Sequence, residues 1–352
     1  MRSVRTPLVP RVLAGLLLAL IPGSALAGCG GAPGPSDAGA APDSSEDASA
    51  GDPGSADPAQ SGTGVLGAAA KPSGTATKPA TVTAPTQTFA VGVSQFTFSR
   101  SGRTLRTLVF YPATGSAGGA PKSNAAVAAG RFPLVLWSHG LHGSPEGYQG
   151  VSAKIAAAGF VVAAPAYPFT NDKANPFNQG DMANQPADAS AVITEVLKLD
   201  TKAGAALAGH IETARVGAAG HSAGGYTTAG MLSGSARDTR LKGGIIVAGG
   251  GMGGRFSGAA TPVLFVHGDK DGTVPYSSGK SLYDSCTWPK GFLTLLGGDH
   301  GAALWGTTPA AQAVSKTMID FFRYTLYGDA AAHGRLRQDA TVSGAAKYDG
   351  NL

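Results

Sequence analysis

The feature that most constrains the fold of this chain is the run Gly220-His221-Ser222-Ala223-Gly224, a G-x-S-x-G motif. Such a motif forms a sharp turn from a strand into a helix and exposes the serine hydroxyl at the end of the strand. The glycines flank the serine because the strand and helix backbones approach closely, so that a Cβ would collide with the neighbouring element. With 53 glycines in 352 residues, the motif also arises by chance, and its surroundings must decide.

The surroundings of Ser222 agree with a strand, a turn and a helix. Residues 213–219 form a short run of small residues suited to a buried strand, and residues 226–232 can continue as a helix up to Ser233-Gly234. This context predicts a hydrolase that uses Ser222 as its nucleophile.

The first 28 residues have the pattern of an export signal. Arg2, Arg5 and Arg11 accompany an apolar segment, residues 12–21, that is too short to span a bilayer as a helix. The following Leu26-Ala27-Gly28-Cys29 resembles a bacterial lipobox, which predicts lipidation of Cys29 and attachment to a membrane surface. Ordinary signal cleavage, with Cys29 incidental, is the alternative, and the mature protein is exported in both cases.

Composition divides the rest of the chain into three parts. Residues 29–86 are rich in Gly, Ala, Pro, Ser, Thr and Asp, which predicts a disordered tether. Residues 87–328 have the size of one catalytic domain, and residues 329–352 are expected to be a C-terminal tail. The net charge is +5, of which the three signal arginines contribute +3, and no Lys/Arg run indicates nucleic acid. Cys286 is expected to be a buried helix residue without a disulfide partner.

Strands alternate with helices along the predicted domain. Apolar patterns predict strands at residues 89–99, 105–111, 132–137, 160–164, 213–219, 244–248, 262–266 and 292–296, the first two paired antiparallel. Helical patterns cover residues 153–158, 187–199, 226–232 and 309–327. This order predicts an α/β fold with a mostly parallel sheet and helices on both faces.

A serine nucleophile needs a histidine that takes its proton and an acid that orients the histidine. Asp271 lies in the loop after the strand at 262–266 and is the expected acid, with Asp269 as its rival. The alternative is that neither is catalytic and both only cap the loop. His300 lies in a glycine-bracketed loop after the last parallel strand and is the expected base. We expect Asp299 to be a loop hydrogen-bonding residue and His221 to be structural.

Two backbone N–H groups must face the negative charge that develops on the substrate oxygen. The first is expected from Ala223, the residue after the nucleophile. The second is expected from the loop at residues 138–143, with Leu141 as first choice and His142 as second. His139 is expected to brace this loop, although a catalytic role for it is the alternative.

Three segments, residues 136–141, 157–164 and 220–225, resemble the platelet-activating-factor acetylhydrolase and dienelactone-hydrolase-like branch of the α/β-hydrolases. Bacterial secreted polyesterases of the cutinase type are similar over the same stretch, which is roughly residues 90–325. The resemblance implies hydrolysis of carboxylic esters through an acyl-serine, without a metal or an organic cofactor.

The chain departs from each of these groups. The acetylhydrolases take their acid after the strand that follows the elbow helix, where residues 247–253 contain no carboxylate. The dienelactone hydrolases have a cysteine at the position of Ser222. The polyesterases commonly have Met at the position of Ala223 and a C-terminal disulfide, and this chain has no cysteine pair there.

The sequence therefore predicts an exported, lipid-anchored carboxylesterase with a Ser222–His300–Asp271 triad, monomeric, acting on a small-molecule or lipid ester. A peptidase or amidase on the same triad and a non-catalytic envelope binding protein are the alternatives. The loop at residues 166–187 either shapes the substrate site or is a plain surface excursion.

Overall fold

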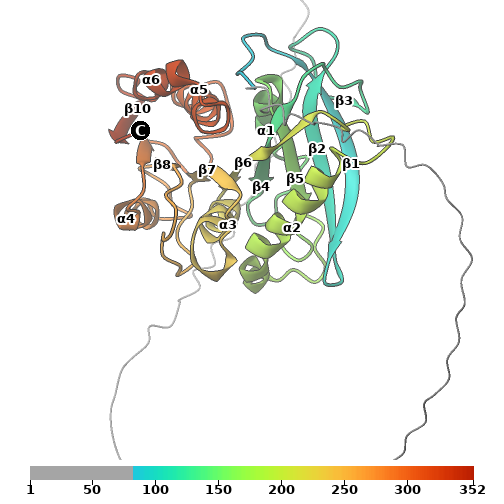
Figure 1. Cartoon of the computed structure of the whole chain (residues 1–352). Coiled ribbons are helices and arrows are strands. Elements are labelled where there is room, and N and C mark those ends of the chain that lie inside the picture. The colour runs from blue at the N-terminus through green and yellow to red at the C-terminus, as the bar shows by residue number, and fades with distance from the viewer. Residues whose placement is uncertain (1–81) are drawn as a thin grey trace, which may run out of the picture. The chain divides into compact units, whose positions relative to one another are not determined.

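The computed structural model describes residues 82–352 (Figure 1). The predicted export signal, Cys29 and residues 30–81 of the predicted tether lie outside the described residues. Residues 82–86, the end of that tether, lie against the domain: the Arg323 guanidinium donates a hydrogen bond to the Pro85 carbonyl at 2.9 Å. Val82 and Ala84 pack against buried side chains of the domain.

The ten strands found within residues 82–352 form one sheet, in the order β10-β9-β8-β7-β6-β4-β5-β2-β1-β3. The strands are β1 Ala90–Arg100, β2 Arg103–Ala113, β3 Lys122–Ser123, β4 Phe132–Ser138, β5 Val161–Ala166, β6 Ile211–His221, β7 Leu241–Val247, β8 Val263–Gly268, β9 Lys290–Leu295 and β10 Ala346–Gly350. From β5 to β9 every neighbouring pair is parallel, whereas β2 joins β5 and β10 joins β9 antiparallel. The predicted antiparallel pairing of the first two strands is confirmed by β1 and β2.

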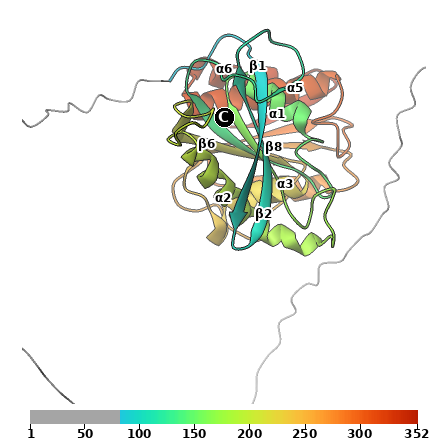
Figure 2. The ribbon, with the colours of Figure 1, turned by 90° about the vertical axis from the view of Figure 1, so that its right-hand side faces the viewer.

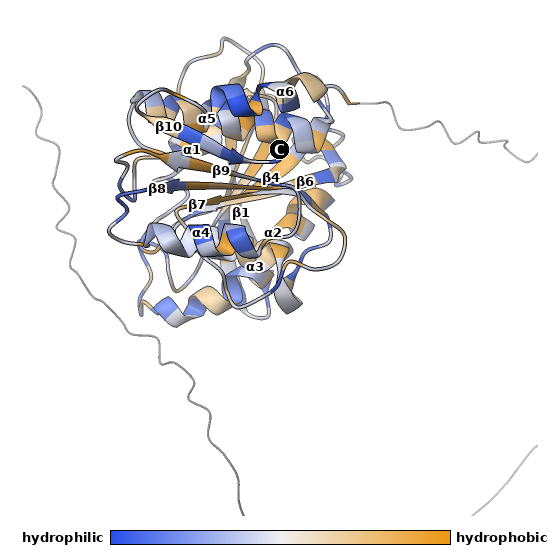
Figure 3. Cartoon of the chain, turned by 90° about the vertical axis from the view of Figure 1, so that its left-hand side faces the viewer, coloured by the Kyte–Doolittle hydropathy of each residue, from blue (hydrophilic) through white to orange (hydrophobic). Residues whose placement is uncertain are grey.

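Helices cover both faces of this sheet, as predicted. The α-helices are α1 Gln149–Ala157, α2 Gln185–Lys198, α3 Ala223–Leu232, α4 Tyr276–Ser285, α5 Pro309–Phe322 and α6 Ala330–Asp339. Short helical turns are η1 Gln179–Asn184, η2 Gly234–Ala236 and η3 Arg323–Tyr327. Figures 2 and 3 show α5 and α6 on one face of the sheet and α2 and α3 on the other. Within residues 82–352, no helix is long and apolar enough to cross a membrane.

Alternation along the central strands supplies two hydrophobic cores. Leu134 and Leu136 of β4 point into the core under α2, α3 and α4. Their neighbours Val135 and Trp137 point into the core under α1, α5 and α6. Successive side chains of a strand lie on opposite faces, so a continuous apolar run needs a helical layer on each side. This explains the run at residues 132–137 and confirms the predicted fold class.

Three local features differ from the pattern or extend it. β2 continues through Pro112 instead of ending before it. Its neighbour β5 pairs only with residues 106–110, so beyond residue 110 β2 is an edge on that side, and proline is tolerated at an edge. The helix predicted at residues 309–327 is α5 followed by the π-helical turn η3, and it ends at Gly328 with φ +72°. Residues 329–352, which we expect from the sequence to be a C-terminal tail, instead contain α6 and the edge strand β10.

Candidate active site

The expected site residues all lie just beyond the carboxyl ends of parallel strands. Leu141 follows β4, Ser222 follows β6, Asp271 follows β8 and His300 follows β9. Ligands of open α/β sheets bind at this edge, because the loops there come together over the sheet. The structure therefore brings the expected residues to one edge of the sheet.

Ser222 occupies a strained turn between β6 and α3. Its backbone has φ +57° and ψ −121°, a region that residues with a side chain rarely adopt and that costs roughly 1–3 kcal/mol. A Cβ on Gly220 would lie 2.2 Å from the Gly224 carbonyl oxygen, and one on Gly224 would lie 2.0 Å from the Ser138 carbonyl oxygen. Both positions are therefore restricted to glycine, for the reason that the motif suggested.

Asp271 and His300 form a hydrogen-bonded pair. His300 Nδ1 lies 2.7 Å from Asp271 Oδ2, and the carboxylate can only accept, so Nδ1 carries the proton and Nε2 is left to accept one. Asp269, the rival acid, accepts instead from the Gly297 N–H at 2.7 Å. Asp299 accepts from the Gly301 N–H at 3.0 Å, as a loop residue does.

The Asp271 carboxylate is buried among donors. The N–H groups of Thr273 and Val274 donate to Oδ1 at 2.8 and 2.9 Å, and His267 Nε2 lies 3.2 Å from Oδ2. Burial alone would raise the pKa of Asp271, but the hydrogen bonds from His267, His300 and the two N–H groups outweigh it and hold the pKa below its usual value. Asp271 is therefore ionised when it faces His300.

No hydrogen bond joins the Ser222 hydroxyl to His300 within the described residues. The Ser222 N–H donates to the Val247 carbonyl at 2.9 Å, which fixes the turn rather than the hydroxyl. In enzymes without substrate, the bond from nucleophile to base is often long and tightens only when substrate binds.

In the loop after β4, the Leu141 N–H is not used by the described part of the protein itself. The Gly140 carbonyl accepts from His139 Nδ1 at 2.7 Å and from the Gly143 N–H at 3.0 Å. The His142 N–H donates to the Thr170 carbonyl at 2.9 Å, so it is already used. In a trans peptide the N–H points away from the carbonyl, so the Leu141 N–H is directed away from His139. Within the described chain, this N–H has no acceptor.

His139 braces this loop from inside the protein. Its ring is buried, its Nε2 accepts from the Tyr167 N–H at 3.1 Å, and its Nδ1 donates to the Gly140 carbonyl. Burial lowers the pKa of His139 to about 4, so the ring is neutral at neutral pH. This geometry matches the expected bracing role and leaves the ring no free nitrogen for catalysis.

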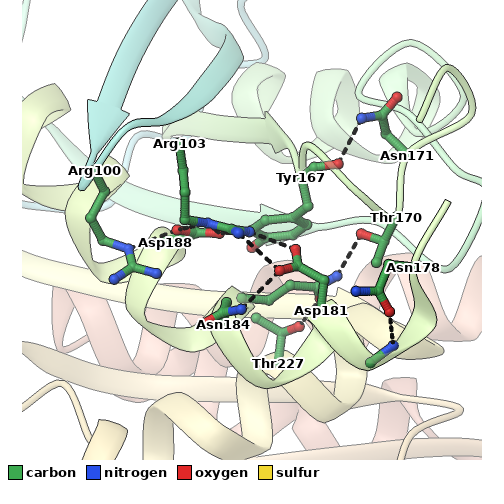
Figure 4. A network of polar contacts seen from close by, with 12 residues as sticks. Arg100, Arg103, Tyr167, Thr170, Asn171, Asn178, Asp181, Asn184, Asp188 and Thr227 are labelled. Atoms are coloured by element: carbon green, nitrogen blue, oxygen red, sulfur yellow. Dashed lines mark hydrogen bonds and ion pairs between the residues drawn. The ribbon is translucent and has the colours of Figure 1, made fainter. Parts of the chain in front are cut away.

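The loop after β5 is fastened beside the site. Arg103 of β2 lies between two buried carboxylates, Asp181 of the loop and Asp188 of α2, at N–O distances of 2.8 and 2.7 Å (Figure 4). Earlier in the same loop, Phe177 stacks on His142 with ring centroids 3.9 Å apart. The loop after β5 therefore lies against the loop after β4, beside the expected site residues.

Three residues near the site were not singled out from the sequence. His267 contacts Asp271, Tyr148 contacts His221 at 2.8 Å, and Trp305 lies edge-on to the His221 ring at 5.2 Å. The only sequence signal among them is the place of His267, near the end of β8 and four residues before Asp271. Tyr148 is 73 residues from its partner, so no local pattern could have revealed it.

The fold, with a serine at positive φ between β6 and α3, defines this protein as an α/β-hydrolase. The family model of PETase, described as PET hydrolase-like, matches residues 67–334, so the chain belongs to the PET hydrolase-like family. It is accordingly a carboxylic ester hydrolase, which is the activity expected first from the sequence, and its likeness to cutinase-type polyesterases is confirmed. No curated protein sequence matches the chain.

Proposed function

We propose that this protein hydrolyses esters through a covalent acyl-serine, with Ser222 as nucleophile, His300 as base and Asp271 as the orienting acid. The observation that carries the proposal is the 2.7 Å hydrogen bond from His300 Nδ1 to Asp271, which joins the loops after β9 and β8. The main-chain carbonyl of His300 in turn accepts from His221, the residue before Ser222. In the neutral ring of His300, the bond to Asp271 places the proton on Nδ1, so that Nε2 is the nitrogen able to take the serine proton, as a general base must.

In the proposed acylation step, Ser222 Oγ attacks the ester carbonyl carbon while His300 Nε2 takes the hydroxyl proton. The carbonyl oxygen becomes an oxyanion that accepts hydrogen bonds from the N–H groups of Leu141 and Ala223. Ala223 is the first residue of α3, so its N–H has no partner within the helix and the helix dipole adds positive charge there.

The tetrahedral intermediate then collapses and releases the alcohol, which receives its proton from His300. A water molecule then attacks the carbonyl carbon of the acyl-serine while His300 takes its proton, and the second oxyanion accepts hydrogen bonds from the same two N–H groups. Collapse of this intermediate breaks the bond between the acyl carbon and Ser222 Oγ, releases the carboxylic acid, and returns the proton from His300 to Oγ. Ionised Asp271 stabilises the imidazolium that forms in both steps.

We propose that the natural substrate is a polyester or a similarly extended ester. Family membership supports this substrate class. The aromatic side chains around the site also support it, since Trp305 and Phe177 are 50% and 37% exposed. Exposed aromatic rings offer apolar area to a solid or extended chain at little cost in conformational entropy.

The mechanism is tested by assaying p-nitrophenyl esters from acetyl to palmitoyl, and a polyester film, with the wild type and three variants. Ser222→Ala, His300→Ala and Asp271→Asn are each expected to lose roughly 10³-fold or more in kcat while remaining folded. Ser116→Ala, at an exposed loop serine, is the matched control and keeps full activity. A fully active Ser222→Ala protein rules the mechanism out.

We propose further that the protein is exported and anchored by a lipid on Cys29, as the N-terminal sequence indicates. Cell fractionation tests this proposal with the full chain. The wild type should sediment with membranes and Cys29→Ala should not, whereas an unchanged distribution of the variant contradicts the anchor.

A further inference from the structure

A line of three hydrogen bonds connects the loop after β4 to the loop after β9. The Gly140 N–H donates to the Tyr148 hydroxyl oxygen at 3.2 Å. The Tyr148 oxygen lies 2.8 Å from His221 Nδ1, and His221 Nε2 lies 2.8 Å from the main-chain carbonyl oxygen of His300. One end of the line is therefore the residue before Leu141, and the other end is the backbone of the proposed base.

The direction of each proton in this line follows from chemistry. The His300 carbonyl can only accept, so His221 Nε2 carries the proton. Burial, and next the neighbouring His300, lower the pKa of His221 to about 4, so its ring is neutral and Nδ1 is an acceptor. Burial raises the pKa of Tyr148 to about 12, so its hydroxyl keeps the proton and donates it to Nδ1. A single tautomer satisfies all three bonds.

The line is shielded from water. Tyr148 and His221 are 6% and 2% exposed, and Trp305 covers them, with ring centroids 5.6 Å from Tyr148 and 5.2 Å from His221. Hydrogen bonds in such surroundings are strong, and losing one partner leaves the other buried and unpaired. The spacing between the two loops is therefore held firmly.

We propose that Tyr148 and His221 are positioning residues that hold the loop after β4 (residues 139–143) and the His300 backbone at a fixed separation over Ser222. This inference rests on the proposed triad. Both ends of the line support groups proposed to act in the chemical step, so we expect the line to affect kcat rather than substrate binding. The His221 and His300 ring centroids lie 4.6 Å apart. Because His221 is neutral, it does not repel the positive charge that His300 carries as an imidazolium.

Tyr148→Phe tests the line most directly, because it removes only the hydroxyl. We expect kcat to fall roughly ten- to a hundredfold, as small misplacements of catalytic groups do, with KM changed less than about twofold. The matched control is Tyr324→Phe, which alters a tyrosine stacked on His333 away from the site and should leave both constants unchanged. Thermal melts establish that each variant is folded.

Two substitutions of His221 separate the halves of the line. His221→Gln can keep a donor for the His300 carbonyl and loses the bond to Tyr148. His221→Asn can keep an acceptor for Tyr148 and loses the bond to the His300 carbonyl. If the two residues act as one unit, the double variant Tyr148→Phe/His221→Gln loses no more kcat than the worse single variant. Losses that multiply in the double variant contradict a single line.

Nitrogen NMR of the histidine-labelled wild type tests the line without any substitution. His221, assigned by comparison with His221→Gln, should show a protonated Nε2 and an unprotonated Nδ1 at pH 7. The opposite tautomer, a charged ring, or an unaltered kcat in folded Tyr148→Phe overturns the inference. An active Ser222→Ala protein would instead overturn the proposed mechanism, so the two failures are distinguishable.

Discussion

Asp271 is held by a second histidine besides the proposed base. His267 Nε2 lies 3.2 Å from Asp271 Oδ2 and 3.0 Å from the Val274 carbonyl, and its ring is buried. Both neighbours are acceptors, so the Nε2 proton is shared between them. We predict that His267→Leu lowers kcat/KM about tenfold and destabilises the fold by roughly 1–3 kcal/mol, because buried acceptors lose their donor.

His267→Gln is the conservative partner of this test, since its amide can donate from nearly the same place. It should keep kcat/KM within about threefold of the wild type and recover most of the stability in urea denaturation. Equal losses for Leu and Gln would show that packing of the imidazole, rather than its proton, is what matters.

At the level of single residues, the sequence predicts those whose role depends on their place after a strand. Asp271 and His300 are predicted on that ground, and Ser222 on its glycine motif after a strand; the structure brings all three to one edge of the sheet. Tyr148 lies in no such place: its partner depends on how α1 meets the turn after β6. Contacts of that kind exist only in the folded chain, which is why sequence reasoning missed them.

Among the elements, the loop after β5 depends on Arg103 of the β1–β2 hairpin. The guanidinium pairs with Asp181 and Asp188, which are 4% and 0% exposed. Removing it leaves two buried carboxylates with fewer partners, so we predict that Arg103→Met destabilises the fold by about 3–5 kcal/mol. Proteolysis should then cut first between residues 167 and 184.

Arg106 of the same strand provides the matched control. Its partner Glu146 is half exposed at 51%, so Arg106→Met should cost less than about 1 kcal/mol in urea denaturation. Similar losses for the two variants would mean that the burial of Asp181 and Asp188 does not set the strength of their pairing.

The elements that the sequence predicts are those with a strong apolar pattern, such as β4, β8 and α2. The two-residue β3 and the short polar β10 have no such pattern, and β10 becomes a strand because β9 offers it an unpaired edge. Helix α4 is indicated in the sequence only by the expected helical Cys286, which is buried at its C-cap. Its extent has no clear apolar pattern, since the buried residues Gly279, Leu282 and Tyr283 are few among polar neighbours.

At the scale of the whole molecule, two buried neutral histidines beside the site make the free energy of unfolding depend on pH. Burial lowers the pKa of both His139 and His221 to about 4, against about 6.5 in an unfolded chain. Between these values the unfolded chain binds protons that the folded protein does not. The stability is therefore complete above about pH 6.5 and is lost as pH falls towards 4, by up to about 1.4 kcal/mol per pH unit for each histidine.

Urea denaturation between pH 7.5 and 4.5 should thus show a falling free energy of unfolding with a slope approaching two protons. His221→Gln is expected to remove about one proton from that slope, whatever it does to the stability at pH 7.5, because the slope counts protons and not contacts. Asp271, whose pKa is held below its usual value, adds its own loss only below about pH 4. A free energy of unfolding that stays level from pH 7.5 to 4.5 would mean that both rings take up protons inside the folded protein. The hydrogen bonds in which neutral His139 and His221 act as acceptors would then be wrong.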